Sequence, residues 1–207
     1  MDQILPELFD NQAGSYDSRN ASYCEKVWNS VLPILPEVKG RWVLDAGCGT
    51  GMITERLADD VGSWGQIVGV DISPKMLEKA TSRLADRRNI TLLRAEMNKV
   101  PERDRSFDVV VCINVLRHVE DLDPALREWR RLLKPDGELL VVDWDGSSFP
   151  VRLAHHILKI ADCSHKKVRS SEEVVSALQN HGFSIIEAKK CSVSALHPIW
   201  IVKAKKN

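Results

Sequence analysis

Three glycines and a carboxylate stand close together at the point where a short apolar run ends. Asp45 is followed by Gly47, Gly49 and Gly51, with one residue between neighbouring glycines. Glycine allows a backbone to turn sharply and to approach a ligand closely. The spacing differs from the G-x-G-x-x-G fingerprint of a pyrophosphate-binding loop, whose third glycine would fall at Met52. Because the Asp45 carboxylate would also repel phosphates, the loop favours a ligand that carries a cationic amino group.

A second carboxylate follows where a ribose-binding acid would stand. Asp71 ends the next apolar segment, twenty residues after Gly51. In an open α/β sheet, a carboxylate at this position accepts hydrogen bonds from ribose hydroxyls. The alternative is a glycine-rich surface turn that precedes an ordinary acid at a strand end. The loop, the acid and their surroundings together favour a nucleoside ligand.

The segments around these residues alternate between apolar runs and helical periodicity, which predict buried strands and helices respectively. Strands are predicted at 42–46, 66–71, 90–94, 107–113, 138–144, 183–188 and 199–204. Helices are predicted at 22–32, 50–60, 73–86, 123–133 and 171–180, and a turn at 134–137. The pattern is interpreted as five strands with a helix in each of the four connections, followed by one helix and two strands.

Strands that alternate with helices predict a parallel sheet with helices on both faces. Too few residues separate the last two predicted strands for a helical crossover, so one of them is expected to be antiparallel. Ligands of such sheets bind at the carboxyl ends of the strands. The fold is therefore expected to bring the glycine loop and Asp71 to one edge of the sheet.

The composition indicates a single domain over residues 1–207. Of these residues 43% are hydrophobic, and 29 basic side chains balance 29 acidic ones. Balanced charge argues against a nucleic-acid partner, and no apolar run approaches the roughly 20 residues that cross a bilayer. The acidic N-terminus does not resemble a secretory signal. Five scattered cysteines indicate a reduced, cytoplasmic chain with no metal site.

Several of these segments resemble motifs of one family, the class I S-adenosylmethionine-dependent methyltransferases, over about residues 16–190. The glycine loop resembles the first motif of the family, and GVDIS at 69–73 resembles the second. LLKPDGEL at 132–139 resembles the LLKPGG turn of the family, with Asp136 in place of the first glycine. Further similar segments lie at 13–17, 95–97 and 107–119.

This resemblance implies an α/β fold with a Rossmann-like, doubly wound, seven-stranded sheet in three α/β/α layers, mostly parallel with an antiparallel last strand. It implies S-adenosyl-L-methionine as the cofactor. Asp45, Gly47 and Gly49 would hold its methionine part, Asp71 its ribose, and Asn114 would lie near its sulfonium. The full implied set is Tyr16, Asp45, Gly47, Cys48, Gly49, Gly51, Asp71, Ile72, Met76, Glu96, Met97, Asn114 and Val115.

The implied reaction is methyl transfer to a small-molecule acceptor by in-line displacement. A general base is needed only if the accepting group is protonated near neutral pH. His118 and Tyr16 are the candidate catalytic residues, because histidine titrates near neutral pH and the tyrosine could orient the substrate. The alternatives are a histidine that packs against the sheet and a tyrosine that only packs in a lid.

The chain is divided into a helical lid (1–40), a cofactor-binding core (41–145), a substrate cap (146–170) and a C-terminal helix with strands (171–207). The cap is locally basic and is interpreted as a surface for an anionic substrate or for peripheral contact with a membrane; the alternative is a solvated face. Its basic residues are Arg152, Lys159, Lys166, Lys167 and Arg169. His155, His156, Cys163 and His165 match no standard metal site.

Within the family, residues 116–121 and 125–128 are most similar to the quinone C-methyltransferases of the ubiquinone and menaquinone pathways. Those usually carry Asn where His118 stands and have a longer chain. Two other classes remain open: a non-catalytic S-adenosylmethionine-binding subunit of a partner protein, and an NAD(P)-dependent oxidoreductase, which the glycine spacing disfavours. A monomer or a homodimer is expected.

Overall fold

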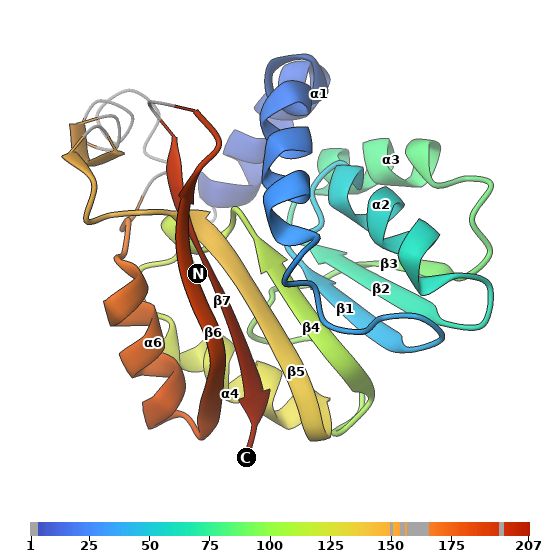
Figure 1. Cartoon of the computed structure of the whole chain (residues 1–207). Helices are drawn as coiled ribbons and strands as arrows, with labels where there is room; N and C mark the ends of the chain where they lie inside the picture. The colour runs from blue at the N-terminus through green and yellow to red at the C-terminus, as the bar shows by residue number, and fades with distance from the viewer. Residues whose placement is uncertain (1–3, 150, 154–155, 157–165, 195–196) are drawn as a thin grey trace.

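Seven strands form one mixed sheet in the computed structural model of the chain (Figure 1). The structure describes residues 4–149, 151–153, 156, 166–194 and 197–207. The strand order is β3-β2-β1-β4-β5-β7-β6. The strands are β1 (Trp42–Ala46), β2 (Gln66–Asp71), β3 (Ile90–Arg94), β4 (Phe107–Ile113), β5 (Leu133–Trp144), β6 (Phe183–Ser192) and β7 (Pro198–Lys206).

The pairing of the strands confirms the fold class. Strands β1 to β5 pair in parallel, whereas β7 runs antiparallel to both β5 and β6. The order reverses between β1 and β4, which places the switch point of the sheet there. The fold is therefore a Rossmann-like α/β sheet whose last strand is antiparallel, as the sequence predicted.

Helices cover both faces of the sheet, which gives the three α/β/α layers (Figure 1). Val27 of α1 and Leu57 of α2 pack on one face, and Trp129 of α4 and Leu178 of α6 pack on the other. These four side chains are fully buried. The helices are α1 (Ile4–Val31), α2 (Met52–Val61), α3 (Pro74–Arg83), η1 (Leu116–His118), α4 (Asp123–Leu132) and α6 (Ser171–Asn180).

The first helix is much longer than the sequence predicted. The prediction began it at residue 22, whereas α1 begins at Ile4 and continues through the polar stretch that contains Gly14. Asn11, Ser15, Ser18 and Arg19 of this stretch are exposed, while Phe9, Tyr16 and Tyr23 follow one another at seven-residue intervals and are partly buried. A spacing of seven keeps side chains on one helix face, so tertiary packing compensates for the weak local signal.

Two further predictions are corrected. The helix expected between β3 and β4 is absent from the described connection, residues 95–106, which contains turns and one bridge between Glu96 and Lys99. Pro101 and the charged residues after it do not supply an apolar helix face. Strand β5 begins at Leu133 rather than 138, although its register with β4 shifts across the predicted turn. There Asp136 has φ 62°, the left-handed conformation that glycine adopts most readily.

None of the helices in the described part of the chain is long and apolar enough to span a bilayer.

Candidate functional site

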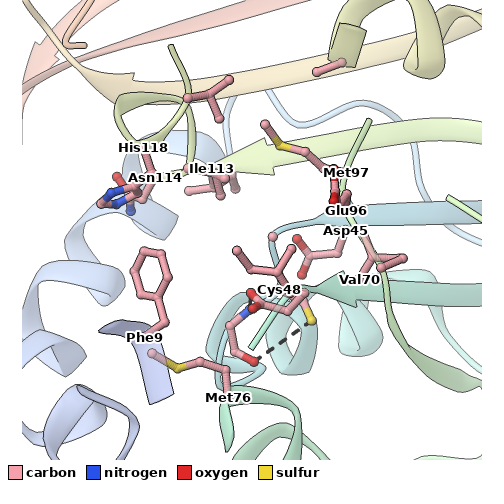
Figure 2. Close-up of a pocket in the computed structure, with 18 of the residues that line it drawn as sticks. Phe9, Asp45, Cys48, Val70, Met76, Glu96, Met97, Ile113, Asn114 and His118 are labelled. Atoms are coloured by element: carbon pink, nitrogen blue, oxygen red, sulfur yellow. Dashed lines mark hydrogen bonds between the residues drawn. The ribbon is translucent and has the colours of Figure 1, made fainter. Parts of the chain in front are cut away.

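A cavity of about 680 Å³ opens at the carboxyl ends of β1, β2 and β4, beside the switch point of the sheet (Figure 2). This is where open α/β sheets bind their ligands. Its volume lies in the range of small-molecule sites, about 300–1,000 Å³. The predicted residues that line it are Tyr16, Asp45, Gly47, Cys48, Gly49, Asp71, Ile72, Met76, Glu96, Met97, Asn114, Val115 and His118.

Gly51 is the one predicted cofactor-binding residue that does not line the cavity. Its φ is 79°, and a Cβ added there would lie 3.2 Å from the Ala80 Cβ and 3.1 Å from the Leu84 Cδ1. This glycine therefore lets the start of α2 pack closely against α3. The spacing of the loop did not predict that its third glycine serves the packing of two helices.

The glycine loop is tied to the acid at the end of β2. The backbone N–H of Gly49 donates to Asp71 Oδ2 at 2.9 Å, and the backbone N–H of Ser73 donates to Asp71 Oδ1 at 2.9 Å. Burial raises the pKa of the Asp71 carboxyl, and these backbone donors oppose that effect. A Cβ on Gly47, whose φ is 87°, would overlap the Val115 side chain. Glycine at that position lets the Val115 side chain pack against the loop.

Asp45 is the most deeply buried carboxylate of the site, with 2% of its surface exposed. Its Oδ2 accepts a hydrogen bond of 2.7 Å from the Thr54 hydroxyl. Burial raises the pKa of Asp45 to about 6, while the bond from Thr54 lowers it and the nearby Asp71 raises it. A buried carboxylate that lines a cavity is a strong partner for a ligand cation, because the low dielectric strengthens their attraction.

Helix α1 forms the roof of the cavity. Phe9, Tyr16 and Cys24 line it from one helix face. The Phe9 ring meets the His118 imidazole edge-on, with 5.0 Å between ring centroids, and Figure 2 shows these two side chains on the same side of the pocket. Burial raises the pKa of the Tyr16 hydroxyl, so this side chain is neutral at physiological pH.

Two carboxylates of α1 fasten the roof to the loops beneath it. Asp10 Oδ1 accepts from the Ser73 hydroxyl at 2.6 Å. Asp17 Oδ1 accepts from the Thr50 hydroxyl at 2.6 Å, and its Oδ2 pairs with Arg83 Nη2 at 2.6 Å. The spacing of seven residues puts both carboxylates on one face of α1. These contacts join the roof to the glycine loop and to the start of α3.

A buried polar network lies behind the cavity, between α1 and the ends of β4 and β5. Arg117 pairs with Asp143 at 2.7 Å, with side-chain exposures of 10% and 3%. The Tyr23 hydroxyl donates to Asn114 Oδ1 at 2.8 Å and accepts from Trp144 Nε1 at 2.8 Å. Tyr23 lies in the helix that the sequence predicted at 22–32, but the sequence analysis missed this role. A prediction of α1 as one long helix would have placed Tyr23 on the same helix face as Phe9 and Tyr16.

The connection after β3 supplies a further residue that the sequence analysis missed. Asn98 lines the cavity beside Glu96 and Met97. Its Oδ1 is buried and has no hydrogen-bond partner among the described residues. Buried acceptors without a partner are uncommon in proteins, so this oxygen suits a ligand that donates a hydrogen bond. The sequence offered one signal for Asn98, which is its position directly after Glu96 and Met97.

The prediction that the basic residues of the cap form a surface is wrong for Arg169. Arg169 is 6% exposed and donates to the main-chain carbonyls of Leu116, Val119 and Glu120 at 2.6–2.9 Å. It fastens the cap to the segment after β4 and is not part of a solvated or membrane-facing surface. Lys166 lines the cavity. Residues 154–155 and 157–165, with Lys159, His155, Cys163 and His165, lie outside the described residues.

Comparisons with known proteins agree with this geometry. A family model described as "Methyltransferase domain" matches residues 44–141, which run from β1 into β5. A demethylmenaquinone methyltransferase of Staphylococcus aureus is 35% identical over 148 residues, covering 70% of this chain and 61% of that protein. The chain therefore spans less than two thirds of the length of that relative.

Solved structures share the fold. An S-adenosylmethionine-dependent methyltransferase of Mesorhizobium loti superposes with a TM-score of 0.75 at 22% identity, covering 87% of this chain and 98% of the other. One from Aquifex aeolicus gives 0.69 at 22% identity, covering 86% and 89%.

The sheet, the switch-point cavity and the paired acids define a Rossmann-like protein that binds a nucleoside cofactor. Within that class, residues 44–141 match the methyltransferase domain family, and the chain is similar to the class I S-adenosylmethionine-dependent methyltransferases.

Proposed function

We propose that this chain transfers a methyl group from S-adenosylmethionine to a small-molecule acceptor. The observation that carries the proposal is the tie between Asp71 and Gly49 at the switch point, with Asp45 buried in the same cavity. These two carboxylates suit the ribose hydroxyls and the ammonium group of the cofactor. The glycine spacing, with Met52 where the third glycine of G-x-G-x-x-G would stand, and the Asp45 carboxylate both disfavour a dinucleotide.

The cavity fits this cofactor at both ends. Its volume of about 680 Å³ suits a ligand of that size. At one end, the orphaned Asn98 Oδ1 would accept from the amino group of the adenine, beside Ile72, Glu96 and Met97. At the other, Asp45 would accept from the ammonium. When bound, the cofactor supplies an electrophilic methyl group on a sulfonium sulfur.

The chain itself would orient the reactants and exclude water. Helix α1 covers the cavity with Phe9 and Tyr16, and holding two reactants in line can lower a barrier by about 7–11 kcal/mol. His118 lines the same cavity and would take the proton of an acceptor that is protonated at neutral pH. Because the hydroxyl of Tyr16 is held neutral by burial, we assign it an orienting role.

The acceptor belongs to the small molecules, and phenols and quinols are the first compounds to test. The similarity to demethylmenaquinone methyltransferase supports this order of testing. His118 departs from the asparagine usual in the quinone group, so the proposal does not fix a quinol as the substrate. Contact of the cap with a membrane surface, a cytoplasmic location and a monomeric or homodimeric state stay predictions.

Calorimetric titration with S-adenosylmethionine, S-adenosylhomocysteine and NADH tests the proposal. We expect saturable binding of the two adenosyl ligands only, and a loss of at least tenfold in affinity in Asp71→Ala. The matched control is Asp59→Ala, an acid that is 63% exposed and pairs with Arg87 on the surface. A preference for NADH would reject the proposal. Binding without turnover on phenols and quinols would favour the non-catalytic subunit.

A further inference from the structure

Asn114 occupies a position where its backbone and its side chain are both constrained. It follows β4 directly with φ 64°, a left-handed conformation that asparagine tolerates better than most residues. The side chain lines the cavity near His118, as Figure 2 shows. A residue held in a sparsely populated conformation beside a cavity is a candidate for a positioning role.

The partners of Asn114 determine which end of its amide meets the cavity. Arg117 Nη1, which can only donate, lies 3.5 Å from the Oδ1 atom, and the Tyr23 hydroxyl lies 2.8 Å from the same atom. The oxygen therefore faces the network behind the cavity. Among the described residues, Nδ2 donates to no protein group, and it is not one of the buried unpartnered atoms. The side-chain N–H groups of Asn114 are thus accessible from the cavity.

The proton of Tyr23 is directed toward Asn114 by Trp144. The indole Nε1–H of Trp144 can only donate, and it occupies a lone pair of the Tyr23 oxygen at 2.8 Å. Tyr23 then donates to Asn114 Oδ1. Because Tyr23 belongs to α1, the roof helix supplies the shorter of the two hydrogen bonds that orient this amide, and Arg117 supplies the longer one.

We propose that Asn114 Nδ2 donates a hydrogen bond to an oxygen of the methyl acceptor, and that Tyr23 of α1 is a positioning residue that orients this amide. The inference rests on the proposed function and deepens it. It predicts an acceptor that presents a phenolic or enolic oxygen. An amino group at the same position would direct its own N–H donors toward the N–H donors of Asn114. It assigns to α1 a part in substrate choice besides covering the cavity.

The test compares two isosteric probes, 1-naphthol and 1-naphthylamine, by titration into protein saturated with S-adenosylhomocysteine. Wild type is expected to bind the naphthol about fivefold more tightly, since one neutral hydrogen bond contributes that order of affinity. In Asn114→Asp the preference should reverse, because a carboxylate accepts from the amine. In Tyr23→Phe the preference should fall toward unity, while affinity for S-adenosylhomocysteine changes less than twofold. Asn29→Asp, at an exposed site on α1, is the matched control.

The outcomes separate this inference from the proposed function. Failure of wild type to bind S-adenosylhomocysteine would reject the proposed function itself. Binding of S-adenosylhomocysteine with no naphthol binding, or with the same probe preference in wild type and Asn114→Asp, would overturn the role of Asn114. A tenfold loss of S-adenosylhomocysteine affinity in Asn114→Asp with unchanged probe preference would also overturn it, because Asn114 would then hold the cofactor.

Discussion

The two buried carboxylates of this site have few hydrogen-bond partners, and burial has the larger effect on their protonation. Asp45 and Asp71 line one cavity, yet only Asp71 is held by backbone N–H donors, whereas Asp45 has a single hydroxyl partner. Burial raises the pKa of both carboxyl groups; backbone N–H donors oppose this effect at Asp71, and the Thr54 hydroxyl opposes it at Asp45. The two carboxylates therefore differ in how strongly they respond to pH and to a bound cation.

The affinity of the cavity for a cationic ligand should depend on pH through Asp45. Its folded-state pKa of about 6 lies above the ordinary value near 4, so the carboxylate becomes protonated as the pH falls through 6. Affinity for S-adenosylhomocysteine should rise about tenfold between pH 5 and pH 7 and then level off. Titration calorimetry across this range checks it, with Asp45→Asn expected to bind weakly and without the slope. A flat wild-type profile would contradict the assignment.

Gly47 should be the least replaceable glycine of the loop. Gly47→Ala introduces a Cβ that overlaps Val115, in a backbone with positive φ, and should destabilise the fold by about 1–3 kcal/mol while weakening cofactor binding. Gly14→Ala is the matched control, because its Cβ meets nothing within 4 Å and lies within α1; it should stabilise by about 0.5–1 kcal/mol. Urea unfolding measures both, and equal behaviour would disprove the steric argument.

At the scale of elements, α1 connects both sides of the cavity. Asp10 and Asp17 join it to the loops on the cofactor side, and Phe9 and Tyr23 meet His118 and Asn114 on the other. The polar contacts hold the N-terminal half of α1, whereas Val27, Trp28 and Val31 anchor its C-terminal half in the apolar core. We therefore expect opening of the cavity to break the polar contacts of the N-terminal half first.

Weakening one of these contacts should speed the exchange of the cofactor. Asp17→Asn removes the charge that pairs with Arg83 and weakens the bond to Thr50. We expect the dissociation rate of S-adenosylhomocysteine to rise about threefold to tenfold with a smaller change in the association rate, as charge-assisted bonds contribute about 1.5–3 kcal/mol at most. Stopped-flow measurement tests this, with Asp59→Asn as the surface control. Unchanged dissociation would show that α1 does not limit exchange.

At the scale of the whole molecule, a buried ion pair and polar anchors connect the site to the C-terminal part of the sheet. Arg117 and Asp143 join η1 to β5, and Arg169 fastens the cap to the segment after β4. The Trp200 indole of β7 in turn donates to the Arg169 carbonyl at 2.9 Å. The antiparallel strand β7 thereby supports a loop that lines the cavity.

Breaking the central ion pair should destabilise the whole fold. Asp143→Asn leaves the Arg117 guanidinium buried without a counter-charge, and such a change costs about 3–5 kcal/mol. Urea unfolding should show a lower midpoint with an unchanged slope. Asp104→Asn is the control, since that acid is 72% exposed in its pair with Arg131 and should cost less than about 1 kcal/mol. Equal effects would mean that solvent screens the Arg117 pair.

The sequence by itself determined the parallel sheet, the bounds of β1 to β4, and the glycine loop with Asp71, because buried strands and tight turns leave strong local patterns. Together with the resemblance to the methyltransferases, it also named 13 of the 28 residues that line the cavity. Only the tertiary structure decided that α1 is one helix, that Gly51 packs against α3, and that Arg169 is buried. It alone brought Tyr23 to Asn114. These features depend on contacts between residues far apart in the chain, which local periodicity and spacing do not encode.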